Sequence, residues 1–204
     1  MTTYVHDLDD PRRDAIVRQA RQHFITEGYA GTRMEPIARE AGVSTATLYA
    51  FFDSKAVLFE AVIENASVDF DRHISAVHAD VGAPREQLTA FIAAYAEFMG
   101  DSFVRSVFRL VLAERHRFEA LAARFFERGR SDFGAVLMRM LTEMTAAGLL
   151  KVEKPSWAAG QLMGMIEHPV FFVPLVTGDE VLASRSVRQI AEDAVETFLA
   201  RYGT

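Results

Sequence analysis

Residues 42–55 read GVSTATLYAFFDSK, and this stretch predicts a short helix that begins directly after a tight turn. Gly42 can adopt the left-handed backbone conformation that ends a preceding helix, and Ser44 is a favoured N-cap residue. Leu48 and Phe52 are four residues apart, so they lie on one face of the helix. We therefore expect a helix with one buried side and one exposed side.

The exposed side of this helix is slim and carries no acidic residue. Its members are small or bear a hydroxyl: Thr45, Ala46, Thr47, Tyr49 and Ala50. A helix of this kind fits the major groove of DNA, where hydroxyls can bond phosphates or base edges and methyl groups can touch thymine methyls. Ser44, Ser54 and Lys55 lie at helix N-termini, which attract phosphate. A plain structural interpretation stays open for each residue, above all for Ser44 as a cap.

Two further helices are predicted upstream. Asp10-Pro11 is typical of a helix start, and Gly28 is typical of a helix end. Thr32 and Glu35 have the spacing of a capping box for the second of these helices. The apolar positions of the two helices are Ile16, Ala20 and Phe24, then Met34, Ile37, Ala38 and Ala41. Three short helices with a glycine in the last turn match a helix-turn-helix.

The rest of the chain is also helical in pattern, because apolar residues recur three and four positions apart and no alternating β-branched run appears. A fourth helix begins after Ser54 and runs for about six turns. Later helices are predicted over residues 85–100, 102–115, 118–128 joined to 131–147, 155–167 and 183–202. Pro169 and Pro174 argue against one straight helix over residues 168–176. The predicted fold class is all-α, with a small N-terminal unit joined by the long fourth helix to a larger core.

Composition narrows the class of protein further. The chain has 204 residues with 22 Lys and Arg against 28 Asp and Glu, a net charge of −6, but residues 11–55 hold seven basic against five acidic side chains. With no cysteine, disulfides and thiolate ligands are excluded. The start lacks a signal-peptide pattern, and the longest uncharged stretches, of 12 and 11 residues, fall short of the roughly 20 that span a membrane. We expect a cytoplasmic protein with no membrane segment.

No motif for catalysis or metal binding was found in the sequence. It contains no HExxH pair, no glycine-rich phosphate loop and no GxSxG elbow, and its six His residues lack metal-ligand spacing. The sequence therefore predicts neither an enzyme nor a cofactor or metal site.

Taken together, residues 42–55 and Leu58 closely resemble the core of TetR-family transcriptional regulators, and residues 28–29, 32, 37–38 and 41 match that family's pattern as well. The resemblance covers about residues 11–60. Residues 108–116, 125–126 and 158–159 look like the AefR-like subset of C-terminal domains, a weaker match. The resemblance implies a helix-turn-helix DNA-binding domain at residues 11–56 and a ligand-binding and dimerisation domain at residues 57–204. Such a homodimer represses transcription from a palindromic operator in double-stranded DNA until a small-molecule effector releases it.

The resemblance also assigns roles by position. Thr45, Thr47 and Tyr49 would contact DNA, Lys55 would clamp a phosphate, and residues 32–33 would meet the DNA backbone. The whole expected DNA-binding set is Thr32, Arg33, Ser44, Thr45, Ala46, Thr47, Tyr49, Phe51 and Lys55. Phe51 departs from the family, because many members carry a His or Tyr there that can bond phosphate. Either a packing role or an apolar contact with sugar or a thymine methyl would replace that bond.

Two further residue sets are expected in the larger domain. The helices at 155–167 and 183–202 occupy the family's usual dimer positions, and their interface candidates are Trp157, Gly160, Met163, Gly164, Val187, Ile190, Ala194 and Phe198. The Gly160 and Gly164 spacing also suits ordinary core packing. Candidates for lining an effector pocket are Phe70, Met99, Phe103, Phe108, His116, Phe133 and Met138, with an apolar or aromatic molecule as the expected effector. Stripes of this kind are more often core than pocket.

Two other functions fit the same sequence. A protein with this fold could have lost DNA binding and act only as a ligand-sequestering or interaction module. An activator would have the same sequence features as a repressor.

Overall fold

The computed structural model describes residues 10–75, 83–129 and 133–204, and the side chains of residues 67–75 and 129 are outside that description. Within these residues the chain forms helices joined by turns, and no β-strand is present. The predicted all-α class is confirmed.

The chain divides into two compact units. Unit 1 consists of Met1–Val68 and Leu110–Phe125, and unit 2 consists of Asp69–Arg109 and Phe126–Thr204. The expected domain boundary between residues 56 and 57 falls inside helix α4 (Lys55–Ser75). Unit 1 also includes residues 110–125, whereas the family resemblance implies that they belong to the larger domain.

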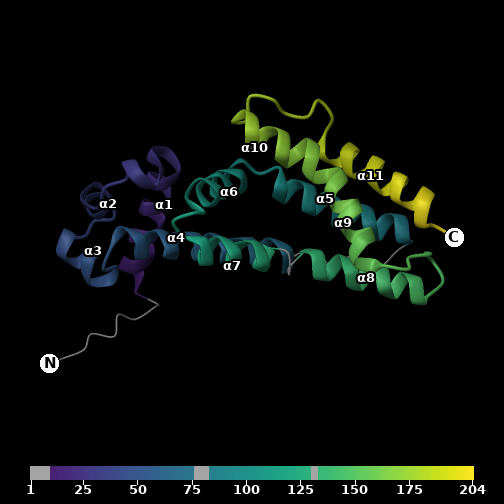
Figure 1. Cartoon of the computed structure of the whole chain (residues 1–204), viewed down its shortest axis with the longest axis horizontal. Helices are drawn as coiled ribbons and strands as arrows, with labels where there is room; N and C mark the ends of the chain where they lie inside the picture. Colours follow the sequence, from purple (N-terminus) through teal and green to yellow (C-terminus); the bar gives the residue numbers. More distant parts are fainter. Residues whose placement is uncertain (1–9, 76–82, 130–132) are drawn as a thin grey trace. The chain divides into compact units, whose positions relative to one another are not determined.

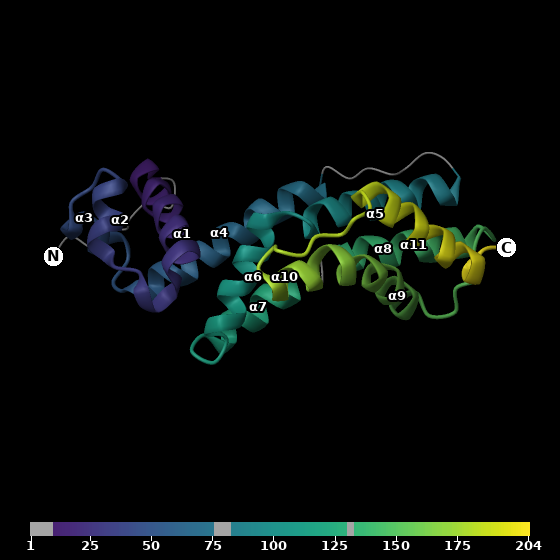
Figure 2. The same cartoon turned by 90° about the horizontal axis from the view of Figure 1, so that it is seen from above.

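Unit 1 contains α1 (Pro11–Gly31), α2 (Met34–Glu40) and α3 (Thr45–Phe51), seen in Figures 1 and 2. As predicted, Asp10 caps α1 by accepting a 2.8 Å hydrogen bond from the Arg12 amide. Gly28 interrupts the regular helix with a φ of 69°, a conformation that favours glycine. Gly42 has a φ of 71° in the turn between α2 and α3. These two glycines set where the helices end.

The predicted capping box at the start of α2 is wrong. The Thr32 hydroxyl donates a 2.7 Å hydrogen bond to the carbonyl of Gly28, and Thr32 is only 1% exposed. Arg33 is the N-cap of α2, and no side chain caps that terminus. Thr32 is therefore used to close the end of α1 rather than to start α2.

Aromatic rings fill the core of unit 1. The Phe59 ring of α4 meets the ring of Phe24 edge-on at 5.1 Å and that of Tyr29 at 5.2 Å. Phe118 packs against Tyr29 and Phe59 at 5.2 Å and 4.9 Å. Ser54 accepts a 3.3 Å hydrogen bond from the Val57 amide, so it caps α4 as predicted. These contacts fix α1 against the first turns of α4.

The later helices lie close to their predicted ranges. They are α5 (Pro84–Met99), α6 (Ser102–Glu114), α7 (Glu119–Gly129), α8 (Ala135–Ala146), α9 (Pro155–Glu167) and α11 (Val187–Tyr202). A further short helix, α10 (Val173–Thr177), has no predicted counterpart. Helix α11 begins at Val187 rather than at residue 183, because Ser186 is its N-cap and accepts a hydrogen bond from the Gln189 amide.

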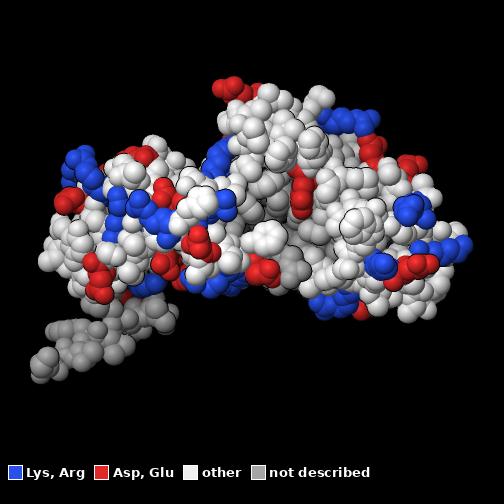
Figure 3. Space-filling view, viewed as in Figure 1, with Lys and Arg blue, Asp and Glu red and all other residues white. Residues whose placement is uncertain are grey.

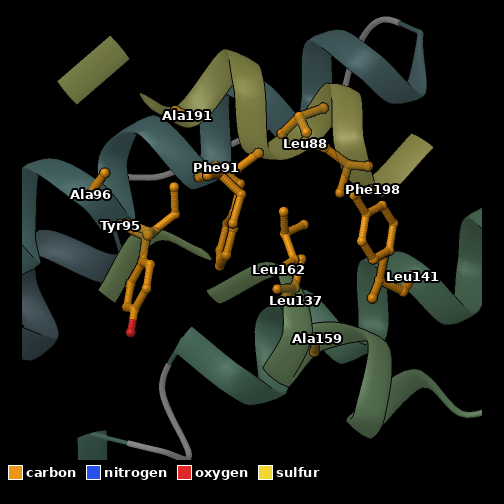
Figure 4. Packing of buried hydrophobic residues seen from close by; sticks show 14 of the residues in the cluster. Leu88, Phe91, Tyr95, Ala96, Leu137, Leu141, Ala159, Leu162, Ala191 and Phe198 are labelled. Atoms are coloured by element: carbon orange, nitrogen blue, oxygen red, sulfur yellow. The ribbon is translucent and has the colours of Figure 1, made fainter. Parts of the chain in front are cut away.

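The core of unit 2 is built mainly where α11 lies alongside α5, as Figures 1 and 2 show. Figure 4 shows buried side chains of α5, α8, α9 and α11 meeting in one cluster. Its labelled members are Leu88, Phe91, Tyr95, Ala96, Leu137, Leu141, Ala159, Leu162, Ala191 and Phe198. Each large apolar side chain buried in this way contributes about 1.5–3 kcal/mol of transfer free energy.

Between α9 and α10 the helical run widens into a π-helical turn, η2 (His168–Phe172). The Val173 amide bonds the His168 carbonyl five residues back, a pattern that accommodates Pro169 without an α-helical bond. Residues 168–176 thus form a π-helical turn followed by α10 rather than regular α-helix throughout, and the helical run is not interrupted at either proline.

The whole run Pro155–Thr177 has 23 residues and a mean hydropathy of 1.2 over its most apolar window, which suffices by length and composition alone to cross a membrane. A core helix passes the same test, and this run places Ala158, Leu162 and Ile166 in the core of unit 2.

Two arginines of α6 fasten the end of α10. Arg105, 4% exposed, bonds Asp179 at 2.6 Å and the carbonyls of Gly100 and Val170. Arg109 bonds Asp179 at 3.3 Å and the carbonyls of residues 174 and 175. Burial alone would raise the pKa of Asp179, but the two arginines outweigh it and lower that pKa. The stabilisation of unit 2 by these arginine–Asp179 ion pairs is therefore present at neutral pH. It is lost only as the pH falls through the lowered pKa of Asp179.

We expect Arg105→Ala to lower the free energy of unfolding of unit 2 by about 3 kcal/mol, because the carbonyls of two residues lose this buried donor and the partly buried Asp179 carboxylate keeps only Arg109. Urea unfolding followed by circular dichroism measures this change. The matched variant Arg109→Ala removes a more exposed arginine, with 32% of its side chain accessible, and should cost about 1 kcal/mol. An equal loss of unfolding free energy in the two variants would contradict the larger contribution assigned to the buried Arg105.

Candidate DNA-binding surface

The buried side of α3 holds it in place. Leu48 is fully buried and Phe52 is nearly so, while Val43 is half-buried at the start of the helix. The Val43 amide donates a 3.0 Å hydrogen bond to the Ala38 carbonyl, which ties the turn to α2. The predicted buried side of α3 is therefore confirmed.

The other side of α3 is open to solvent. Ser44, Ala46 and Ala50 are exposed, Tyr49 is 43% exposed, and Thr45 and Thr47 are half-buried. Among the described residues, no hydrogen bond engages the hydroxyl of Thr45 or of Tyr49, so both can take a partner from outside the chain. The surface has the slim shape and the free hydroxyls that a groove-reading helix needs.

Ser44 is engaged within α3. Its Oγ accepts a 3.0 Å hydrogen bond from the Thr47 amide, and the hydroxyls of Ser44 and Thr47 share a 2.8 Å hydrogen bond. Ser44 is thus the N-cap of α3, in line with its structural interpretation, and it orients the Thr47 side chain.

The Phe51 ring makes a cation–π contact with Arg12. The guanidinium of Arg12 lies over its ring at 5.5 Å, within the range of a cation–π interaction. Asp10 holds that guanidinium through hydrogen bonds of 2.7–3.2 Å. Phe51 is half-buried, so its ring both packs within unit 1 and lies against the Arg12 guanidinium.

Lys55 is engaged at the end of α1. Its Nζ donates hydrogen bonds to the carbonyls of Ala30 at 3.2 Å and Thr32 at 2.9 Å, and it lies 4.7 Å from the centre of the Tyr29 ring. Two of its three N–H donors therefore satisfy carbonyls of the segment that leads into α2. Thr32, which is buried, presents no side chain to a ligand, whereas Arg33 beside it is exposed.

His23 joins α1 to α2 and was not singled out from sequence. Its Nδ1 lies 2.7 Å from an oxygen of Glu27, and its Nε2 lies 3.0 Å from an oxygen of Glu40. The four-residue spacing to Glu27 is visible in the sequence, but the contact with Glu40, 17 residues away, is not. Burial alone would lower the pKa of His23, yet the two carboxylates outweigh it and raise that pKa.

Charge is mixed over this unit. In Figure 3, basic and acidic side chains are interspersed on the visible face of unit 1. Binding to DNA would therefore depend on a few well-placed cations rather than on a broad basic patch. No group of His, Asp and Glu suited to a metal ion occurs in the described ranges.

The expected pocket residues have different surroundings. Met99 and Phe133 are buried in the core of unit 2, and Met138 packs against it. Phe103 and Phe108 are half-buried, and the Phe108 ring meets that of Phe171 edge-on at 4.8 Å. His116 is exposed and belongs to unit 1, whereas the other described candidates belong to unit 2. The side chain of Phe70 lies outside the described residues.

A polar pair occurs beside the aromatic part of that core. The Tyr95 hydroxyl donates a 2.5 Å hydrogen bond to Glu167, and the rings of Tyr95 and Phe133 meet at 4.9 Å. Burial, together with the charge of Glu167, raises the pKa of Tyr95, so its hydroxyl stays protonated.

The expected interface residues separate into two groups. Trp157, Gly160 and Gly164 are exposed, and Met163 and Val187 are half-buried. The other three, Ile190, Ala194 and Phe198, are buried against the chain's own core. They have no surface to offer a partner, because the apolar side of α11 packs on α5 and its outer side is polar.

We expect Lys55→Ala to destabilise the segment between α1 and α2 by about 1–2 kcal/mol, because two carbonyls lose a charged donor. Faster hydrogen exchange at the amides of residues 32–34 would reveal this. Lys151→Ala removes an exposed lysine of unit 2 and should leave those amides unchanged. Unchanged exchange in Lys55→Ala would show that the lysine does not hold this segment.

Two family profiles match the chain. Residues 16–62 match the profile described as bacterial regulatory proteins of the tetR family. Residues 86–204 match the AefR-like transcriptional repressor C-terminal domain. The second match covers more than half of the 204 residues.

Named relatives agree with these profiles. The transcriptional repressor NicS of Pseudomonas putida is 28% identical over 79% of this chain and 68% of its own length. The transcriptional regulator BetI of Agrobacterium fabrum is 31% identical over 82% of each chain.

Solved structures show the same architecture. A TetR-family regulator from Mesorhizobium loti MAFF303099 superposes with a TM-score of 0.81 at 27% identity, over 95% of this chain and 97% of that one. The flavonoid-responsive regulator FrrA superposes with a TM-score of 0.74 at 30% identity, over 94% and 97%. The chain belongs to the TetR family of bacterial transcriptional regulators, with a C-terminal region of the AefR-like type.

Proposed function

We propose that this protein is a ligand-responsive repressor that binds a palindromic operator in double-stranded DNA as a homodimer. The exposed side of α3 carries the proposal, because it is slim, free of acidic residues and held from beneath by Leu48 and Phe52. Two such helices, related by the dimer axis, would read half-sites about 34–36 Å apart in successive major grooves. We infer a repressor rather than an activator because the relative NicS is named a repressor and the matching C-terminal profile is described as that of an AefR-like repressor.

The proposed contacts follow from exposure and hydrogen bonding. Thr45 and Tyr49 would bond DNA through hydroxyls that are free in the described structure, and Ala46 would offer its methyl group. Thr47 would read sequence, and Arg33 would meet a phosphate. Lys55 would act mainly by holding the segment before α2, and Thr32 has no surface for a contact.

The effector is proposed to be a small apolar or aromatic molecule that binds in unit 2. FrrA, a similar structure, is described as flavonoid-responsive, which favours an aromatic compound. Binding would tilt α4, which has residues in both units, and so weaken the hold on the operator. A coupling of about 1–3 kcal/mol, or 5- to 150-fold in affinity, is the usual scale.

We expect Ala46→Glu to lower operator affinity by about tenfold or more relative to Ala46→Gln, because the two side chains have similar size and only the first brings a negative charge toward phosphate. The affinity is measured by fluorescence anisotropy at fixed salt, on a duplex that the wild-type protein selects from random sequence. A panel of flavonoids is then added to the protein–DNA complex, and a fall in anisotropy would show that an aromatic compound releases the operator.

Ala123→Glu, on the exposed side of α7, is the matched control and should bind as the wild type does. Equal operator affinity of the Ala46→Glu and Ala46→Gln proteins would show that α3 does not face DNA. If the wild-type protein selects no duplex at all, the fold serves ligand sequestration or another interaction instead.

The dimer is proposed to form through the outer side of α9. Trp157 is 66% exposed there, and a side chain added at Gly160 or Gly164 would meet nothing within 4 Å. An exposed tryptophan beside two open glycines offers apolar area and a close approach to a second helix. Phe172, the last residue of the π-helical turn, and Val176 of α10 add further exposed apolar area.

We expect Gly164→Arg to raise the dimer dissociation constant by about tenfold or more, because the new side chain would occupy the space of the partner helix. Sedimentation velocity over a range of protein concentrations measures this. Gly164→Ala fills little space, favours the helix and should leave the dimer largely intact. A wild-type protein that stays monomeric at micromolar concentration would refute the proposed assembly.

A further inference from the structure

The contact between α1 and α2 contains a histidine with both ring nitrogens engaged. His23 of α1 is flanked by Glu27 of the same helix and by Glu40 at the end of α2, at 2.7 Å and 3.0 Å. Only 11% of its side chain is accessible. Figure 1 shows α1 and α2 as neighbours in this unit.

The proton count of the ring follows from this geometry. A neutral imidazole has one N–H donor and one lone pair, whereas an imidazolium has two donors. An ionised carboxylate can only accept. Both hydrogen bonds therefore exist together only when His23 is doubly protonated, and loss of either proton turns a lone pair toward a carboxylate oxygen.

The end of α2 matters because it leads directly into α3. Glu40 is the last residue of α2, and after it only the turn around Gly42 precedes the next helix. The Val43 amide binds the Ala38 carbonyl, so the turn is tied to α2. A shift of α2 relative to α1 would therefore carry α3 with it.

We propose that His23 is a positioning residue, whose charged ring fastens α2 to α1 and so holds α3 in its DNA-reading position. The inference rests on the proposed function, since operator affinity is its readout. Deprotonation of His23 removes one of the two bonds and loosens this clamp, so operator binding weakens as the pH rises.

The charged groups around the ring are consistent with this direction. Glu27 acts on it from α1 and Glu40 from α2, and a guanidinium nitrogen of Arg39 lies 3.8 Å from the other oxygen of Glu40. The pKa of His23 is raised despite its burial. The contribution of the His23–Glu27 and His23–Glu40 bonds to the stability of the α1–α2 contact is therefore complete below the ordinary histidine pKa of about 6.5. It is lost as the pH rises through the raised pKa of His23.

The first test compares full-length wild-type and His23→Gln proteins between pH 6 and pH 9 at fixed salt, by anisotropy on the selected duplex. Wild-type affinity should fall by about threefold to tenfold over this range, since the carboxylates are partly exposed. Gln keeps an N–H donor but does not titrate, so His23→Gln should give a flatter profile. His168→Gln removes an exposed histidine of unit 2 and should keep the wild-type profile.

The second test uses Glu40→Gln, which removes one of the two charges that favour the imidazolium. The midpoint of the affinity profile should move to lower pH, and the titration of the His23 ring, followed by NMR, should move with it. A merely structural role would not shift this midpoint. This variant and the wild-type NMR titration decide the question even if His23→Gln fails to fold.

Two results would overturn the clamp: identical pH profiles for the wild type and His23→Gln, or a His23 ring that NMR shows to be neutral at pH 6. A protein that selects no duplex at any pH would instead refute the proposed function. In that case the NMR titration and the pH dependence of thermal unfolding of unit 1 still test the clamp.

Discussion

The packing of Leu48 and Phe52 beneath α3 is the constraint on which the rest of the DNA-binding unit depends. With these side chains buried, the opposite side of a seven-residue helix must face outward. So short a helix is not stable by itself, and its orientation comes from tertiary contacts. The Gly42 turn, the Ser44 cap and the Lys55 contacts each remove one way in which α3 could shift.

Features that depend on neighbours in sequence could be predicted from the sequence. Asp10, Ser44 and Ser54 cap the helices expected of them, and Gly28 and Gly42 have the positive φ values that end helices. Each of these rests on residues within about four positions of one another, where the chemistry of the helix terminus is local. The all-α class and most helix bounds follow from the same local information.

Features that depend on distant partners could not be predicted. Thr32 had the spacing of a cap but bonds backward to Gly28, and Lys55 finds its carbonyls 23 and 25 residues away. The buried stripe of α11 shows a related limit: periodicity marks Phe198 as covered, but it cannot tell whether the chain's own α5 or a second subunit covers it. Sequence likewise places Arg105 on a helix without revealing that its partner Asp179 lies 74 residues later.

The position of Trp157 has one more consequence. It is the single tryptophan of the chain and stands in the open on α9. Tryptophan fluorescence excited at the red edge of the absorption band will therefore come from this one position in the sequence, without a contribution from a second indole. The wavelength of its emission maximum depends on whether water or protein surrounds the indole ring. The intrinsic fluorescence of the protein therefore reports on burial of the exposed side of α9.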